Sequence, residues 1–236
     1  MFAQLNHWIF IAVTAVDAIL LLRVLQLKLH RTYLFITLAC ALTVFFDGVA
    51  LWLGPESNEN LQVFLYSRFL YVFILPAAAY DVWEEVKTQI AQIRKLAALR
   101  LVASLTLASI FGLIIAAVAG REEGGDALFD TFAIILWAAA STASLAFLWS
   151  MHRVLAAQKI TTSGNTAVWL VYFQLLLAAE VLTCFLLIAG RAFSTVVIDS
   201  LEFSLNLYQI SITIWCTWKL RGIASGVPST PENANF

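Results

Sequence analysis

The chain alternates between long apolar segments and short polar ones. Seven apolar segments are long enough to cross about 30 Å of hydrocarbon as helices that rise about 1.5 Å per residue. They occupy residues 8–27, 33–53, 61–83, 101–119, 127–150, 166–189 and 193–218. This pattern predicts an all-α polytopic membrane protein, in which a seven-transmembrane-helix bundle fills residues 1–221 as one domain. Residues 222–236 are rich in Gly, Ser, Pro and Asn, so we expect a disordered cytoplasmic tail.

The last apolar segment carries a polar stripe. Its polar residues follow one another at intervals of three or four, which places them on one face of a helix. They are Thr195, Asp199, Glu202, Asn206, Gln209 and Thr213. A polar face inside a membrane needs partners other than lipid. We therefore expect this helix to face the interior of the bundle, with the other segments as the wall around it.

Composition and loop charge agree with a membrane protein. Hydrophobic residues make up 61% of the 236 residues and charged residues 12%, whereas soluble domains have about 45–50% and about 25%. Most Lys and Arg residues lie after the first, third and fifth segments and after the last one. Because basic loops stay in the cytoplasm, we predict an external amino terminus, a cytoplasmic carboxyl terminus and a location in the plasma (inner) membrane.

The tryptophans lie mostly near segment ends, where an indole ring can sit at the level of the lipid headgroups. These are Trp8, Trp52, Trp83, Trp149, Trp169, Trp215 and Trp218, whereas Trp137 is well inside a span.

Ionisable residues gather in one half of the predicted bundle. With the middle of each segment placed at the bilayer centre, five acids and one arginine lie close to that centre or between it and the external surface. They are Asp17, Asp47, Arg68, Glu180, Asp199 and Glu202. Such residues are costly in a membrane and are candidates for function by default. One arginine cannot pair with five ionised carboxylates, so some must be protonated, in contact with water or bound to a cation.

We therefore predict a polar ligand- or ion-binding site in the outer half of the bundle. Its candidate residues are Asp47, Arg68, Tyr71, Glu180, Asp199, Glu202, Asn206 and Gln209. Arg68 can hold two carboxylates through its planar fork. Pro76, which removes a backbone donor from the third helix, is a candidate hinge. A structural ion-pair network that fixes helix register would use the same charged residues. Arg23 and Asp81 lie near the other surface, where side chains can reach water.

The predicted spans lack the residues that common cofactors and catalytic motifs require. The three histidines, His7, His30 and His152, lie at segment ends, so no pair could hold haem inside the bundle. The chain has no zinc-type cluster, no HExxH or GxSxG motif and no phosphate-binding glycine loop. We expect neither an enzyme nor a cofactor or metal. A net charge of −1 without a basic patch predicts no nucleic-acid partner.

The third segment resembles one helix of a known family. The order Arg68, Pro76, Asp81 is similar to the third helix of the microbial rhodopsins, which also have seven helices and an external amino terminus. Those proteins hold retinal on a lysine of the seventh helix. Here the lysines, Lys28, Lys87, Lys95, Lys159 and Lys219, lie in loops or at a helix end. Retinal cannot be attached, a light-driven pump is excluded, and we do not assign the family.

These features predict a receptor-like or sensory module embedded in the lipid bilayer. Because no output domain is visible, its state would pass to a membrane or cytoplasmic protein partner through residues 84–100, a predicted amphipathic helix. Two alternatives stay open. One is a small proton- or cation-linked transporter or channel that uses the stripe of the last segment. The other is an accessory subunit of a larger membrane complex. The oligomeric state is unknown from the sequence.

Overall fold

The computed structural model describes residues 2–54, 57–87, 125–189 and 195–222. Its long elements are α1 (Phe2–Gln26), α2 (Leu34–Leu53), α3 (Asn58–Val86), α5 (Gly125–Ala157), α6 (Gly164–Ala189) and α7 (Thr195–Lys219). A short 3-10 helix, η1 (Leu29–Arg31), joins α1 to α2, and the described ranges contain no strand. The prediction of an all-helical protein is confirmed for these ranges. The predicted span 101–119 and the tail beyond residue 222 lie outside them.

Five of the described helices are long and apolar enough to cross a membrane. Their apolar stretches are Leu5–Gln26, Leu34–Leu53, Gln62–Val86, Phe132–Ala157 and Gly164–Leu187. These helices identify a multi-pass membrane protein. α7 has 25 residues, as α1 does, but its polar stripe makes it less apolar and it is not among the five. Seven spans and an external amino terminus therefore stay predictions.

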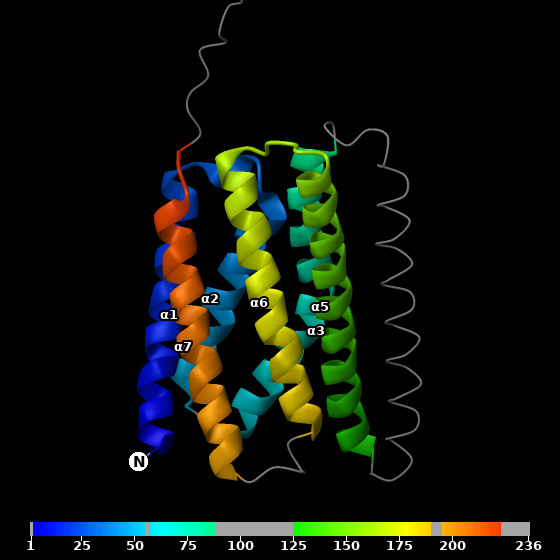
Figure 1. The fold of residues 1–236 in the computed structure, drawn as a ribbon. Coiled ribbons are helices and arrows are strands. Elements are labelled where there is room, and N and C mark those ends of the chain that lie inside the picture. Colours follow the sequence, from blue (N-terminus) through cyan, green and yellow to red (C-terminus); the bar gives the residue numbers. More distant parts are fainter. Residues whose placement is uncertain (1, 55–56, 88–124, 190–194, 223–236) are drawn as a thin grey trace, which may run out of the picture.

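The six long helices in the described part of the chain stand side by side and form a closed ring (Figure 1). Each contacts the next in the order α1, α2, α3, α5, α6, α7, and α7 returns to α1. α3 also contacts α6 across the ring. This order brings the last helix beside the first and places residues of α1, α2, α3, α6 and α7 around a common interior.

Most of the packed apolar core lies at one end of the ring. At this end α1, α3 and α7 finish and α2 and α6 begin (Figure 1). The core residues there have almost no exposed surface, among them Val24, Ile36, Val82, Trp169 and Cys216. In a membrane, where lipid tails are as apolar as leucine, close van der Waals contact holds helices together. Close packing of buried apolar side chains therefore holds the helices together at this end.

Polar contacts tie the helices at the same end. The Asp81 carboxylate of α3 accepts a hydrogen bond from the backbone N–H of Ile36 at 2.9 Å, in the first turn of α2. This bond satisfies a backbone donor that the helix itself cannot pair. The hydroxyl groups of Tyr33, the residue before α2, and of Thr166 on α6 lie 2.9 Å apart and form a second link. Asp81 is buried, so the expectation that it reaches water is wrong, because the start of α2 supplies its partner.

The tryptophans divide into two groups. Trp8, Trp52, Trp149 and Trp218 are each more than half exposed, and they lie towards the two ends of the ring as an aromatic belt requires. Trp83 and Trp169 are buried in the core, so the prediction that they sit among headgroups is wrong. Both lie near the ends of their helices but point inwards, a distinction that position along a span does not reveal.

Candidate functional site

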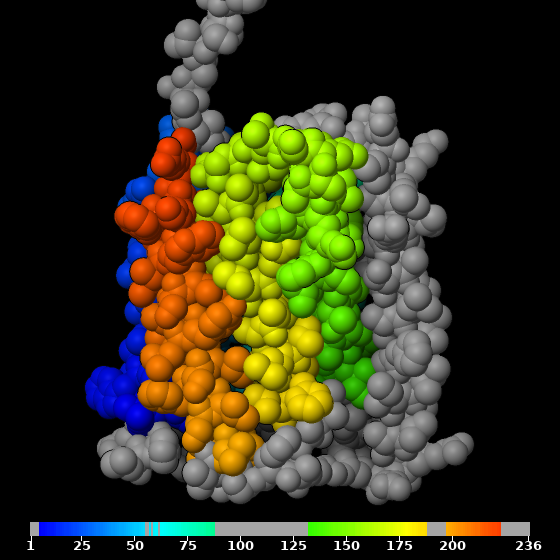
Figure 2. Space-filling model, viewed as in Figure 1, coloured from blue at the N-terminus to red at the C-terminus, as the bar shows by residue number. Residues whose placement is uncertain are grey.

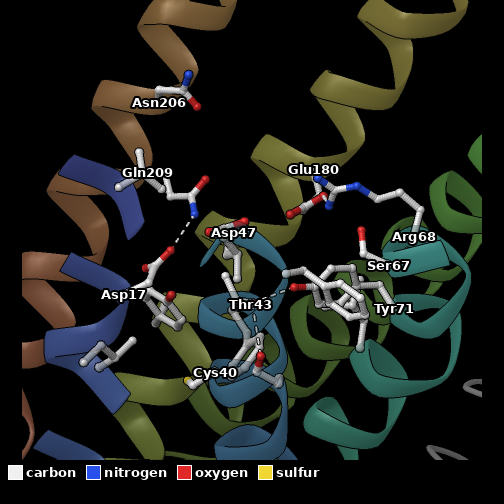
Figure 3. Close-up of a pocket in the computed structure, with 18 of the residues that line it drawn as sticks. Asp17, Cys40, Thr43, Asp47, Ser67, Arg68, Tyr71, Glu180, Asn206 and Gln209 are labelled. Carbon is white, nitrogen blue, oxygen red and sulfur yellow. Dashed lines mark hydrogen bonds and ion pairs between the residues drawn. The ribbon is translucent and has the colours of Figure 1, made fainter. Parts of the chain in front are cut away.

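A cavity of about 150 Å³ lies inside the ring. Its wall comes from α1, α2, α3, α6 and α7 and contains three carboxyl groups and one guanidinium group, those of Asp17, Asp47, Glu180 and Arg68. Hydroxyl and amide groups complete its polar part, from Thr43, Ser67, Tyr71, Tyr172, Asn206 and Gln209. Figure 3 shows the four charged side chains around one space, each on a different helix. Four ionisable groups from separate apolar helices thus meet around a space large enough for a small molecule.

One side of the cavity is formed where α1 meets α7. The Gln209 side-chain amide donates a hydrogen bond to Asp17 Oδ2 at 3.2 Å (Figure 3). Asp17 is almost fully buried, and this bond supplies one of the partners that a buried carboxyl group needs. One turn farther along the stripe, the Thr213 hydroxyl lies 3.5 Å from that of Tyr172 on α6. The middle and later part of the stripe on α7 therefore faces the bundle interior.

Arg68 and Glu180 meet on the opposite side, where α3 contacts α6. Arg68 Nη1 lies 3.7 Å from Glu180 Oε2, a distance for an ion pair but too long for a hydrogen bond. The Arg68 guanidinium carbon also lies 4.1 Å from the ring centre of Trp137 and 4.5 Å from that of Phe64. Such cation–π contacts stabilise a guanidinium group away from water. Aromatic faces hold much of Arg68, and Glu180 retains capacity for another partner.

Asp47 of α2 lies between these two groups (Figure 3). It lines the cavity and forms no hydrogen bond or ion pair within the part of the chain that the structure describes. One turn earlier, the Thr43 hydroxyl donates to the Ala39 carbonyl at 3.1 Å. The Thr43 proton is thereby used, so the Tyr71 hydroxyl donates to Thr43 Oγ1 at 2.7 Å. This bond fixes the Tyr71 ring on the cavity wall.

Most of the residues predicted for the site meet at this cavity. Asp47, Arg68, Tyr71, Glu180, Asn206 and Gln209 line it. Asp199 and Glu202 lie on α7 but outside the cavity wall, and Glu202 is exposed. Both are closer than Asn206 to the start of α7, so they lie between the cavity and that end of the bundle.

Sequence reasoning missed several members of the wall. The sequence places Asp17 near the centre of the membrane, but Asp17 is not among the residues predicted for the site. Thr43, Ser67 and Tyr172 line the cavity as well. A buried charge at the depth of Asp47 and Arg68 was the signal that could have placed Asp17. The three hydroxyl residues carry no such signal, because isolated Ser, Thr and Tyr residues are common throughout membrane helices.

The structure describes the predicted hinge but only the first residues of the predicted docking segment. α3 runs without interruption through Pro76. Because proline has no N–H, the carbonyl of Val72 lacks its helical donor. Glu84 and Lys87 form an ion pair at the end of α3. Residues 88–100, the rest of the predicted partner-docking segment, lie outside the described residues.

Within the described residues, no three His, Cys, Asp or Glu side chains come close enough together to hold a metal ion. Comparisons with protein-family models, with curated proteins and with solved structures gave no match to this chain. The protein is thus placed by its own features alone: it is a multi-pass helical membrane protein with a charged cavity inside its ring of described helices.

Proposed function

We propose that this protein is a receptor-like membrane module that binds a small ligand in the cavity. The observation that carries the proposal is the incomplete pairing of charges on the wall. Asp47 forms no hydrogen bond or ion pair with the described residues, and Arg68 and Glu180 stand 3.7 Å apart. Charges inside a membrane protein cost free energy unless they are paired or hydrated. A ligand that completes these contacts recovers that free energy on binding.

The packing beyond the cavity supports a binding site over a path through the membrane. Leu20 and Phe173 line the cavity. One turn farther towards the packed end, Val24 and Trp169 are fully buried, as is Cys216 on α7. A continuous proton or cation route would need polar side chains or water at this level. Apolar packing there favours a vestibule that is closed on the side of the packed core.

α3 is the element best placed to report ligand binding. It carries Arg68 and Tyr71 on the cavity wall, and Pro76 follows within two turns. Farther along, Asp81 holds the start of α2 through its bond to Ile36. A change in the ligation or protonation of Asp47 and Glu180 around Arg68 would shift α3 about Pro76. A protein partner would read that shift at the end of α3, where residues 84–100 begin.

Cysteine labelling from the two sides of the membrane tests this function. The background carries Ala in place of Cys40, Cys184 and Cys216, and Asn206→Cys places one thiol on the cavity wall. The reagent is the membrane-impermeant 2-(trimethylammonium)ethyl methanethiosulfonate, applied to sealed vesicles of known orientation. We expect labelling from one face only, because the cavity is closed by the packed end of the bundle.

Ser204→Cys in the same background is the matched control. Ser204 is two residues away on α7 but is exposed on the surface of the ring, where lipid would surround it. We expect no labelling of this position from either face. Labelling of Asn206→Cys from both faces would contradict a receptor and support a transport path. No labelling from either face would contradict a ligand site and support a structural role for the charges.

A further inference from the structure

We infer that the ligand of the cavity is a small organic ammonium ion. This inference rests on the function proposed above and specifies its ligand. The first argument is charge. The wall carries three carboxyl groups but only one guanidinium, and that guanidinium already contacts Glu180, Trp137 and Phe64. The groups on the wall that lack a partner of opposite charge are therefore acidic, and a ligand with a positive charge would supply that partner.

The second argument is the spacing of the carboxyl groups. Asp17, Asp47 and Glu180 come from three helices and stand around the cavity rather than at one point (Figure 3). The described residues offer no group of three such side chains close enough for a metal ion, whose oxygen ligands lie about 2.0–2.6 Å from it. A cation with several atoms can contact separated carboxylates at once. The geometry therefore favours a polyatomic cation over a bare metal ion.

The third argument is size and the apolar part of the wall. Engineered protein cavities of about 150 Å³ hold a molecule the size of benzene, and this cavity has about that volume. Aromatic side chains line it beside the acids, namely Phe10, Phe46, Tyr71, Tyr172 and Phe173. Aromatic rings and carboxylates together bind ammonium groups, through cation–π contacts and through charge-assisted hydrogen bonds. An ammonium ion with a short hydrocarbon body satisfies both parts of the wall.

Arg68 shows that the interior of this bundle can hold an organic cation. Its guanidinium group is itself an organic cation, and it lies over two aromatic rings with a carboxylate beside it. The bundle interior thus already stabilises one such ion at the α3–α6 side of the cavity. The other side, around Asp47, Asp17 and Asn206, presents similar chemistry, and no Lys or Arg of the described residues lines it. The ligand is expected to lie there, with Asp47 as its main anchor.

The experiment measures binding of two cations and their neutral analogues to the full chain in detergent. Choline is compared with 3,3-dimethyl-1-butanol, and n-butylammonium with 1-butanol, at constant ionic strength set with NaCl. We expect at least one of the two cations to raise the temperature of unfolding and to give a saturable titration by calorimetry, because a ligand stabilises the state that it binds. The neutral analogues and Na⁺ are expected to have no such effect.

Two variants locate the binding. Asp47→Asn is expected to weaken the affinity for the cation about tenfold or more, because it removes one charge-assisted contact. Glu202→Gln removes a carboxyl group from α7 that lies off the cavity wall, and it should leave the affinity unchanged. An equal loss in both variants would show a general effect of net charge and would overturn the assignment.

Other outcomes separate this inference from the proposed function. If neutral analogues bind as well as the cations, or if neither cation binds although Asn206→Cys is labelled from one face, the ligand class is wrong and the receptor function stands. If Asn206→Cys is labelled from both faces or from neither, the proposed function itself fails.

Discussion

Arg68 is a cation whose surroundings are largely aromatic. Two rings lie within 4.5 Å of its guanidinium carbon, Glu180 is 3.7 Å away, and its Nε is buried without a hydrogen-bond partner. A planar guanidinium tolerates such a site better than an ammonium group, because it is less strongly hydrated and can stack on a ring. Arg68 therefore both neutralises Glu180 and forms part of the wall on which a ligand rests.

This pairing predicts a coupling between Arg68 and Glu180. Arg68→Gln leaves Glu180 without its cation, so this variant should be clearly less stable than wild type. In the double variant with Glu180→Gln, part of the loss should be recovered. A coupling energy of about 0.5–3 kcal/mol is expected for contacting residues of this kind, measured by unfolding in mixed micelles. Strictly additive effects of the two substitutions would show that the ion pair does not contribute.

Ionisable residues in apolar segments were the part of the site most open to prediction. Asp47, Arg68 and Glu180 were placed at similar depths from their positions in the sequence, and the structure brings them to one cavity. Asp199 and Glu202 belong to the same stripe as Asn206, yet they lie off the wall. Helical periodicity fixes the face of α7 on which a residue lies, but the extent of the cavity along α7 depends on the neighbouring helices.

At the scale of whole elements, α2 and α3 are joined by one buried contact. Asp81 accepts the N–H of Ile36 in the first turn of α2. Asp81 was expected near the membrane surface because it is close to the end of its span. Its role depends on where α2 begins in space, which no local pattern in α3 encodes. The contact couples the helix that carries Arg68 to the helix that carries Asp47.

Replacement of Asp81 tests this link. Asp81→Ala leaves the Ile36 N–H buried without an acceptor, which costs about 1–3 kcal/mol. Asp81→Asn keeps an uncharged acceptor, so its stability should fall between those of wild type and Asp81→Ala. Glu85→Ala, one turn later on α3 and exposed, is the control and should change stability little. Equal stability of the two Asp81 variants and the control would show that the contact is dispensable.

For the whole molecule, length and hydropathy predicted an all-helical membrane protein, and five apolar helices in the described residues agree with that class. The pairing of helices was not predictable, because lipid-facing and protein-facing residues are equally apolar. Trp169 illustrates this, since it is fully buried although it lies near the start of α6. The ring order, and with it the cavity, emerges only from the three-dimensional structure.

The orientation in the membrane gives a further prediction at this scale. Glu59, at the start of α3, and Thr161, between α5 and α6, are exposed at opposite ends of the ring. In a cysteine-free background, Glu59→Cys should be labelled by an impermeant thiol reagent in intact cells, and Thr161→Cys only after the membrane is opened. The charge of the loops sets this expectation. The reverse pattern would invert the orientation and place the charged cavity in the cytoplasmic half.

Figure 2 shows α6 and α7 side by side. α7 also contacts α1 and so closes the ring. The interior that they enclose is where the proposed ligand would lie. The most direct measurement is therefore whether a bound ligand protects a residue of the cavity wall from chemical labelling. The rate of labelling of Asn206→Cys by the cationic methanethiosulfonate is recorded with choline, with n-butylammonium and with their neutral analogues. We predict that a bound ammonium ion slows the labelling and that the neutral analogues do not. An unchanged rate with saturating concentrations of both cations would contradict a cation site in the cavity.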